Sequence, residues 1–115
     1  MSEANLEKLS DVVTEAHTRI QNDFKNINPI VGVNRGMRSS GIPADAMTID
    51  CLRTGKRIII ILHDQHPDIL QYQFSYKASD PAEEFQKLSI NDLSDQVLYD
   101  WMKGYFSVAS DKNLN

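Results

Sequence analysis

The hydrophobic and polar positions of residues 6–27 follow the period of an amphipathic helix. Apolar side chains recur at steps of three and four residues and so fall on one stripe: Leu6, Leu9, Val13, Ala16, Ile20, Phe24 and Ile27. Charged side chains occupy the opposite face, and Pro29 prevents the helix from continuing. The pattern predicts one long N-terminal helix that packs its apolar stripe on the rest of the chain.

Three segments in the middle of the chain predict strands. Residues 47–51 and 70–77 alternate apolar with polar side chains, which is typical of a strand with one buried face. Residues 57–62 lie between them and are apolar at nearly every position, which favours the central place in the sheet. We expect these three strands to form an antiparallel meander.

The turn between the first two strands predicts their register. Thr54 and Gly55 suit a two-residue hairpin turn. With that turn, three apolar pairs face each other: Cys51 with Ile58, Ile49 with Ile60, and Met47 with Leu62.

Two further helices are expected after the strands. Asp80, Pro81 and Glu83 match a helix start, with a cap, a proline in the first turn and an acid three residues on, which predicts a short helix over about 80–88. Asn91 or Ser94 can cap a longer helix with an apolar stripe: Leu93, Val97, Leu98, Trp101, Met102 and Tyr105.

These elements predict an α+β fold of the order α-β-β-β-α-α. A long N-terminal helix, a three-stranded antiparallel meander, and one short and one longer C-terminal helix follow one another, with the long helices on one face of the sheet. The 115 residues suffice for one core and not for two, so we expect a single domain over 1–115. Residues 110–115 are polar, and we expect a disordered tail there.

The composition points to a cytoplasmic protein that makes no membrane contact. Apolar residues make up 41% of the chain and charged residues 24%, close to the globular average. The longest wholly apolar run, 58–62, is far shorter than the roughly 20 residues of a membrane helix, and the acidic N-terminus does not resemble a signal peptide. Cys51 is the only cysteine, which excludes an intramolecular disulfide and fits a reducing compartment.

The charge distribution argues against nucleic-acid binding. Helix, three strands, helix is also the element order of the double-stranded RNA-binding domain, which grips phosphates with lysines at the start of its last helix. The corresponding segments here carry acids instead: Asp80, Glu83, Glu84, Asp92 and Asp95. These side chains repel a phosphate backbone, so the resemblance ends at the order of elements and we predict no nucleic-acid partner.

The glycine-rich segment 30–45 is expected to be a long irregular loop, and it is a candidate site for a small anion. Its glycines let the backbone approach an anion, its hydroxyl and amide groups can hydrogen-bond to one, and its arginines can neutralise one. The predicted ligand-binding residues are Asn34, Arg35, Arg38, Ser39 and Ser40. The segment matches neither a Walker loop nor a dinucleotide fingerprint, and solvated loop arginines are the more common case.

The turn after the central strand is a candidate metal site. His63, Asp64, His66 and Asp68 combine two imidazoles with two carboxylates, which are ligands of zinc and other divalent ions and also form acid–base pairs. The same residue types are common in ordinary turns, which is the alternative interpretation. We predict no bound cofactor.

Two functional hypotheses remain. The first is a small non-enzymatic protein-interaction module, such as an adaptor, inhibitor, immunity-type or chaperone-like protein. It binds another protein, or itself as a homodimer through Ile59 and Ile61, which lie on the sheet face opposite the helices and need cover there. The alternative is a small hydrolase or anion-binding enzyme that uses the His63–Asp68 turn together with Arg35 and Arg38.

Overall fold

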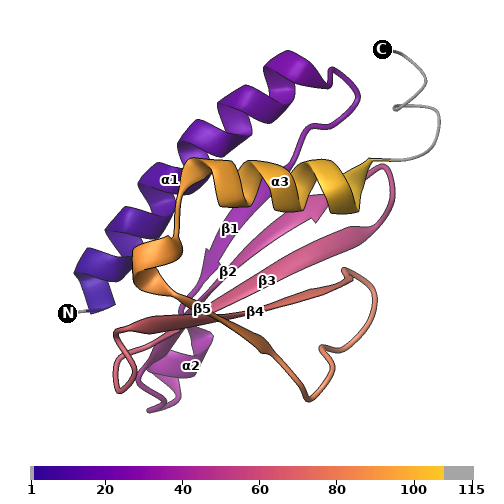
Figure 1. Cartoon of the computed structure of the whole chain (residues 1–115). Helices are drawn as coiled ribbons and strands as arrows, with labels where there is room; N and C mark the ends of the chain where they lie inside the picture. Colours follow the sequence, from indigo (N-terminus) through magenta and orange to yellow (C-terminus); the bar gives the residue numbers. More distant parts are fainter. Residues whose placement is uncertain (1, 108–115) are drawn as a thin grey trace.

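The computed structural model describes residues 2–107, with side chains from residue 4 onward, and places two long helices on one face of an antiparallel sheet (Figure 1). The tail expected over 110–115 lies outside these residues. The elements in chain order are α1 (Ser2–Asp23), β1 (Ile30–Asn34), α2 (Gly36–Ser39), β2 (Ala44–Cys51), β3 (Lys56–His63), β4 (Ile69–Tyr76), β5 (Gln86–Ser89), the 3-10 turn η1 (Ile90–Asp92) and α3 (Asp95–Phe106).

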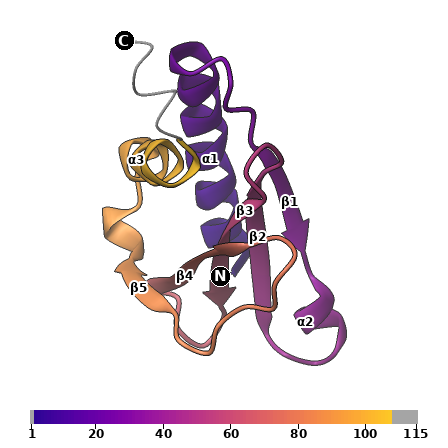
Figure 2. The ribbon, with the colours of Figure 1, turned by 90° about the vertical axis from the view of Figure 1, so that its right-hand side faces the viewer.

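Each strand pairs with the next one along the chain, in the spatial order β1-β2-β3-β4-β5. The expected α+β class and antiparallel sheet are therefore confirmed, whereas the expected three strands are wrong, because the described residues form five. β1 and β5 lie at opposite edges of the sheet, and α1 and α3 lie together on one side of it (Figure 2).

The hairpin between β2 and β3 has a longer loop than the sequence predicts. Cys51 pairs with Lys56 rather than with Ile58, so residues 52–55 form the loop in place of a two-residue turn. Gly55 adopts the left-handed conformation at φ 74°, and its N–H donates to the carbonyl of Cys51 at 2.8 Å. The register moves by two residues, which is one full strand period, so the expected buried face is retained and the partners across it change.

Segment 30–45, expected to be irregular, contains a strand and one helical turn. β1 pairs with β2 from Ile30, opposite Asp50, to Asn34, opposite Ala46. α2 follows immediately, and the side-chain oxygen of Asn34 accepts a hydrogen bond from the N–H of Gly36 at 2.7 Å. The long loop of the sequence is thus an edge strand followed by a tight turn.

Residues 80–88, expected to form a short helix, form none: residues 80–85 are irregular, and residues 86–88 belong to β5. The segment 77–85 crosses the sheet face that points away from the helices (Figures 1 and 2), and β5 then pairs with β4. The amide of Gln73 holds this segment: its Nε2 donates to the carbonyls of Ala82 and Glu84 at 3.1 and 2.8 Å, and its Oε1 accepts from the N–H of Ala82 at 2.9 Å. Tertiary contacts of the backbone therefore override the local helix-start signal.

The last helix, α3, begins after Ser94, which is one of the two caps that the sequence predicts. The hydroxyl of Ser94 accepts a hydrogen bond from the N–H of Val97 at 3.2 Å and so caps α3. α3 contacts α1 through an ion pair between Arg19 and Asp95, at 2.7 Å. The two helices and the facing side of the sheet enclose the core, whose fully buried members include Leu9, Ala16, Ile20, Ile49, Ile58, Ile60, Leu98, Met102 and Phe106.

The sheet face away from the helices is covered by the chain itself at its centre. Ile59 is 7% exposed, and its cross-strand partner is Gln73, which anchors the crossing segment 77–85. A second subunit is therefore not needed to shield Ile59, whereas Ile61 is half-buried. A homodimer through these two isoleucines stays a prediction.

Replacing Gln73 by alanine is expected to loosen the crossing segment. The variant loses three hydrogen bonds to the backbone of 77–85, and we expect the free energy of unfolding to fall by about 1 to 2 kcal/mol, because the released backbone groups are exposed and can bind water. Hydrogen exchange of the 77–85 amides should accelerate. Gln71→Ala, on the same strand and face, is the control, and equal exchange in both variants would show that Gln73 does not hold the segment.

Candidate functional site

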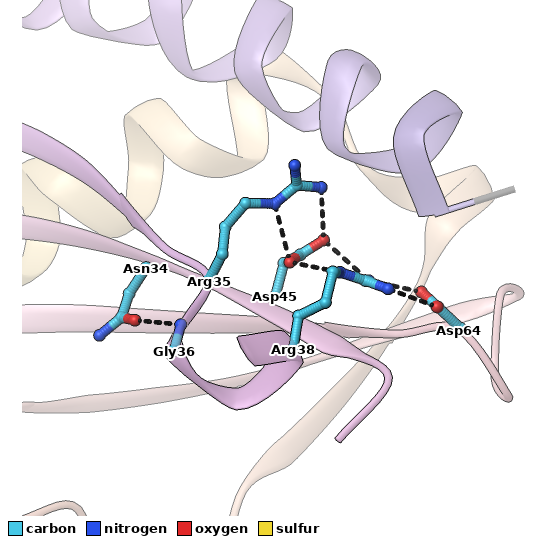
Figure 3. Close-up of polar contacts among 6 residues, drawn as sticks. All are labelled: Asn34, Arg35, Gly36, Arg38, Asp45 and Asp64. Carbon is cyan, nitrogen blue, oxygen red and sulfur yellow. Dashed lines mark hydrogen bonds and ion pairs between the residues drawn. The ribbon is translucent and has the colours of Figure 1, made fainter. Parts of the chain in front are cut away.

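The two arginines of the predicted anion loop bind carboxylates of the chain itself (Figure 3). Nε and Nη2 of Arg35 donate to the two carboxylate oxygens of Asp45 at 3.1 and 3.2 Å. The same atoms of Arg38 donate to these oxygens at 3.0 and 3.1 Å. Arg38 also donates to both oxygens of Asp64 at 2.9 Å, so its guanidinium lies between two carboxylates.

Asp45 is the buried centre of this network. Its side chain is 1% exposed, and a carboxylate at that depth requires counter-charges and hydrogen bonds. Hydrogen bonds from Arg38, and then from Arg35, hold the pKa of Asp45 below its usual value. Asp64 and Asp45 in turn raise the pKa of Arg38. The network joins the end of β1, α2, the start of β2 and the turn after β3.

The remaining residues of the predicted anion loop do not converge on one point. Asn34 accepts from the backbone of Gly36, as described above, while Ser39 and Ser40 are exposed at the end of α2. Both arginines of this loop, Arg35 and Arg38, already have carboxylate partners. Anion binding by the loop stays a prediction.

Of the four predicted metal ligands, the structure brings the two imidazoles together. The ring centroids of His63 and His66 are 5.7 Å apart, whereas Asp64 is bound to Arg38 and Asp68 is exposed. Within residues 2–107, no group of three or more His, Cys, Asp or Glu side chains is placed to hold a metal ion. Coordination by all four residues would require Asp64 to leave Arg38.

The edge strand β1 is not predicted by the pattern of the sequence. All five of its residues are exposed, and the exposed fractions of Ile30, Val31 and Val33 are 48%, 37% and 48%. Among the residues that the structure describes, β1 pairs with β2 alone, so the backbone groups on its outer side are open to another strand. The residues after Pro29 are apolar and mostly β-branched, a composition that favours a strand. Gly32 interrupts this run and favoured the interpretation as a loop.

The two edges of the sheet differ in how well they are protected. β5 is a four-residue strand with Lys87 on it, and short length and lysine are both features that discourage further strand pairing. β1 carries no charged residue and presents two valines on the helix side of the sheet, beside Met47 and Ile49 of β2. Of these two edges, β1 is the one suited to accept another strand.

A groove of about 320 Å³ lies between α1 and β1 on the helix side of the sheet. Its lining residues are Ser10, Val13, Thr14, His17, Thr18, Val31, Val33 and Met47, and none is an Asp, Glu, Lys or Arg. The hydroxyls of Thr14 and Thr18 donate to carbonyls of their own helix at 2.8 and 3.1 Å. His17 bonds to the carbonyl of Pro29 at 2.6 Å. Because these three polar side chains have partners and the wall carries no charged residue, the groove favours apolar side chains.

A second exposed apolar group lies on β4, on the helix side. Phe74 is 39% exposed and stacks on Tyr105 of α3 at a centroid distance of 5.0 Å, with Trp101 edge-on at 5.8 Å. β4 is paired on both sides, so this group offers side chains but no open backbone edge. This group therefore differs from β1 in offering apolar exposure alone.

Comparison of the chain with protein-family models, with curated proteins and with solved structures finds no match. In residues 2–107, the structure contains no helix with the length and apolar character needed to cross a membrane.

Proposed function

We propose that this chain is a small non-enzymatic protein-interaction module that binds an extended segment of another protein as a sixth strand beside β1. The observation that supports it is the combination of an open apolar edge strand with an uncharged groove along the same edge. Strand addition is a common mode of peptide recognition, in which backbone hydrogen bonds give affinity and pockets for alternate side chains give specificity.

The geometry of the edge specifies the pattern of the added strand. Side chains on one strand alternate between the two sheet faces, so every second residue of the added segment points to the helix side. These residues come to lie beside Val31 and Val33 and enter the groove below α1. The residues between them lie beside Ile30 and Gly32 on the other face.

The groove favours a foreign segment over a second copy of the chain. In a symmetric pair of β1 strands, each copy would offer the other only Val31 and Val33 on the helix side, and valine is short for a groove of this volume. Two copies would also each bring a net charge of −4. We therefore infer a partner segment with long, uncharged apolar side chains, such as leucine, methionine or phenylalanine, at every second position.

The enzymatic alternative finds less support in the arrangement of its residues. The His63–Asp68 turn and the arginine loop do meet, but they meet through the ion pair between Arg38 and Asp64. An arginine of the predicted anion loop and an acid of the predicted metal turn thus neutralise each other in the folded chain. No specific observation favours a hydrolase.

Selection of peptides from a displayed random library tests the proposed function. We expect the peptides enriched on the wild-type chain to share apolar residues at alternate positions. Val31→Lys/Val33→Lys should weaken their binding by about tenfold or more, because charge on an edge strand and in an apolar groove opposes strand addition. Both valines are more than a third exposed, so the variant should fold, which circular dichroism verifies.

Phe74→Lys is the control for a lysine on an exposed apolar position, because it places one lysine, against two in the double variant, at a similarly exposed side chain on a fully paired strand. It should leave peptide binding unchanged. Equal binding to wild type and to Val31→Lys/Val33→Lys would contradict the proposal. Sedimentation of the wild type as a dimer that the double lysine variant dissociates would identify a second copy as the occupant and overturn the foreign partner.

A further inference from the structure

A small basic pocket lies on the sheet face away from the helices, toward the β5 edge. Ile61, Gln71 and Lys87 are direct cross-strand neighbours on β3, β4 and β5 and therefore form one row across that face. With His63, His66 and Ile69 they line a cavity of about 120 Å³. This pocket and the β1 groove occupy opposite edges and opposite faces of the sheet, so the inference goes beyond the proposed function.

The lining of the pocket suits an anion. Lys87, the two imidazoles and the amide of Gln71 all provide hydrogen-bond donors, and none of the lining residues is acidic. Asp64, the nearest acid in sequence to His63, is held by Arg38. A lysine beside two imidazoles repels a metal ion but attracts a carboxylate or phosphate.

The unpaired Nδ1 of His63 supports the role of this imidazole as a hydrogen-bond donor. Nδ1 of His63 is buried and has no hydrogen-bond partner among the described residues. An unpaired N–H is costlier to bury than an unpaired acceptor, so we assign to the ring the tautomer that carries its proton on Nε2. Nε2 is then the ring nitrogen that can donate to a ligand.

We infer that this pocket binds a small carboxylate that carries a short apolar chain. The volume is well below the roughly 300–1,000 Å³ of sites for drug-sized ligands and limits the ligand to a few non-hydrogen atoms. Ile61 and Ile69 give the apolar chain a surface to contact, while the exposed Lys87 side chain reaches the carboxylate from the β5 edge. Free phosphate has no apolar group that could contact Ile61 and Ile69.

Titration of the isotope-labelled chain with butyrate, followed by backbone amide shifts, tests this inference. Saturable shifts should appear in residues 61–71 and at Lys87, while the neutral isostere butyramide should cause none and inorganic phosphate should bind more weakly. Lys87→Gln should weaken butyrate binding by about tenfold or more, as expected for the loss of one charged hydrogen bond. Lys77→Gln, at an exposed lysine outside the pocket, should bind as the wild type does.

Three results would overturn the inference. The first is the absence of saturation below about 50 mM, an affinity that six non-hydrogen atoms reach even at low ligand efficiency. The second is phosphate binding as tight as that of butyrate, which would remove the role of the apolar chain. The third is saturable zinc binding that shifts His63 and His66 while butyrate shifts neither, which would restore the metal site. None of these results bears on peptide binding at β1, so the two proposals fail independently.

Discussion

Replacing both arginines of the Asp45 network by alanine is expected to destabilise the fold strongly, although the two side chains are partly exposed. The double variant leaves Asp45 buried without a counter-ion. Breaking a buried pair in this way costs about 3 kcal/mol, at the lower end of its range here because water can enter where the guanidinium groups were. Arg35→Ala/Arg38→Ala/Asp45→Ala removes the carboxylate as well, and we expect it to regain part of that loss.

The pH dependence of this loss has a defined sign. In the wild type the pKa of Asp45 lies below its unfolded value of about 3.9, so the network contributes fully above that pH and its contribution is lost as pH falls through the native pKa. In the double variant, burial without the arginines raises the pKa of Asp45 above the unfolded value. The deficit relative to the wild type should therefore shrink as pH falls from 7 toward 4.

Urea denaturation of the wild type, the double variant and the triple variant at both pH values measures this effect. A triple variant that is no more stable than the double variant would contradict the role of Asp45 as a buried charge that needs its arginines. A deficit that stays constant with pH would contradict it equally.

Replacing Ile60 by alanine is expected to lower the free energy of unfolding by about 2 to 5 kcal/mol. Ile60 is fully buried in the central strand, between Met47 and Tyr72 on the neighbouring strands. The loss combines the transfer of the removed carbons to water with the cavity that they leave. Thermal or urea unfolding measures it.

Ile61→Ala is the matched control for this substitution. It changes the same residue type at the next position of the same strand, but on the opposite face, where the side chain is half-buried. Its loss should be clearly smaller. Equal losses for the two variants would contradict the assignment of the buried face of β3.

The elements that the sequence predicted correctly are those whose own periodicity is strong. α1, the strands β2 to β4 and α3 each bury a face that recurs at the helix or strand period, and so their patterns suffice. The shift in the β2–β3 register did not disturb this, because a shift of two residues keeps the same side chains on the same face.

The two outer strands, β1 and β5, could not be predicted from periodicity, and the reasons are physical. β5 is set by pairing with β4 and by the bonds from Gln73 to a segment nine and more residues away, while the local signal at residues 80–83 favours a helix. β1 is exposed on both faces and contains Gly32, so it lacks the alternation that a buried face imposes. Edge strands are determined by their neighbour more than by their own pattern.

For the candidate sites too, the sequence shows which residues are present, whereas the fold decides which of them lie together. The sequence identified the charged residues of the arginine loop and of the histidine turn, but the partners of a charge depend on the fold. Asp45 lies on the helix side at the start of β2, where Arg35 and Arg38 both reach it, and Asp64 lies on the far side of Arg38 (Figure 3). Lys87 joins the two imidazoles only because β5 pairs with β4.

The proposed function depends most on β1, whose open edge would accept a sixth strand. The direct measurement is a set of intermolecular nuclear Overhauser effects between the labelled chain and the tightest peptide from the selection. Strand addition predicts regularly spaced contacts between the peptide backbone and residues 30–34, with alternate peptide side chains contacting Val13, Thr14 and Thr18 in the groove. Peptide contacts confined to Phe74 and Tyr105, or to the outer surface of α1, with none to residues 30–34, would contradict the account.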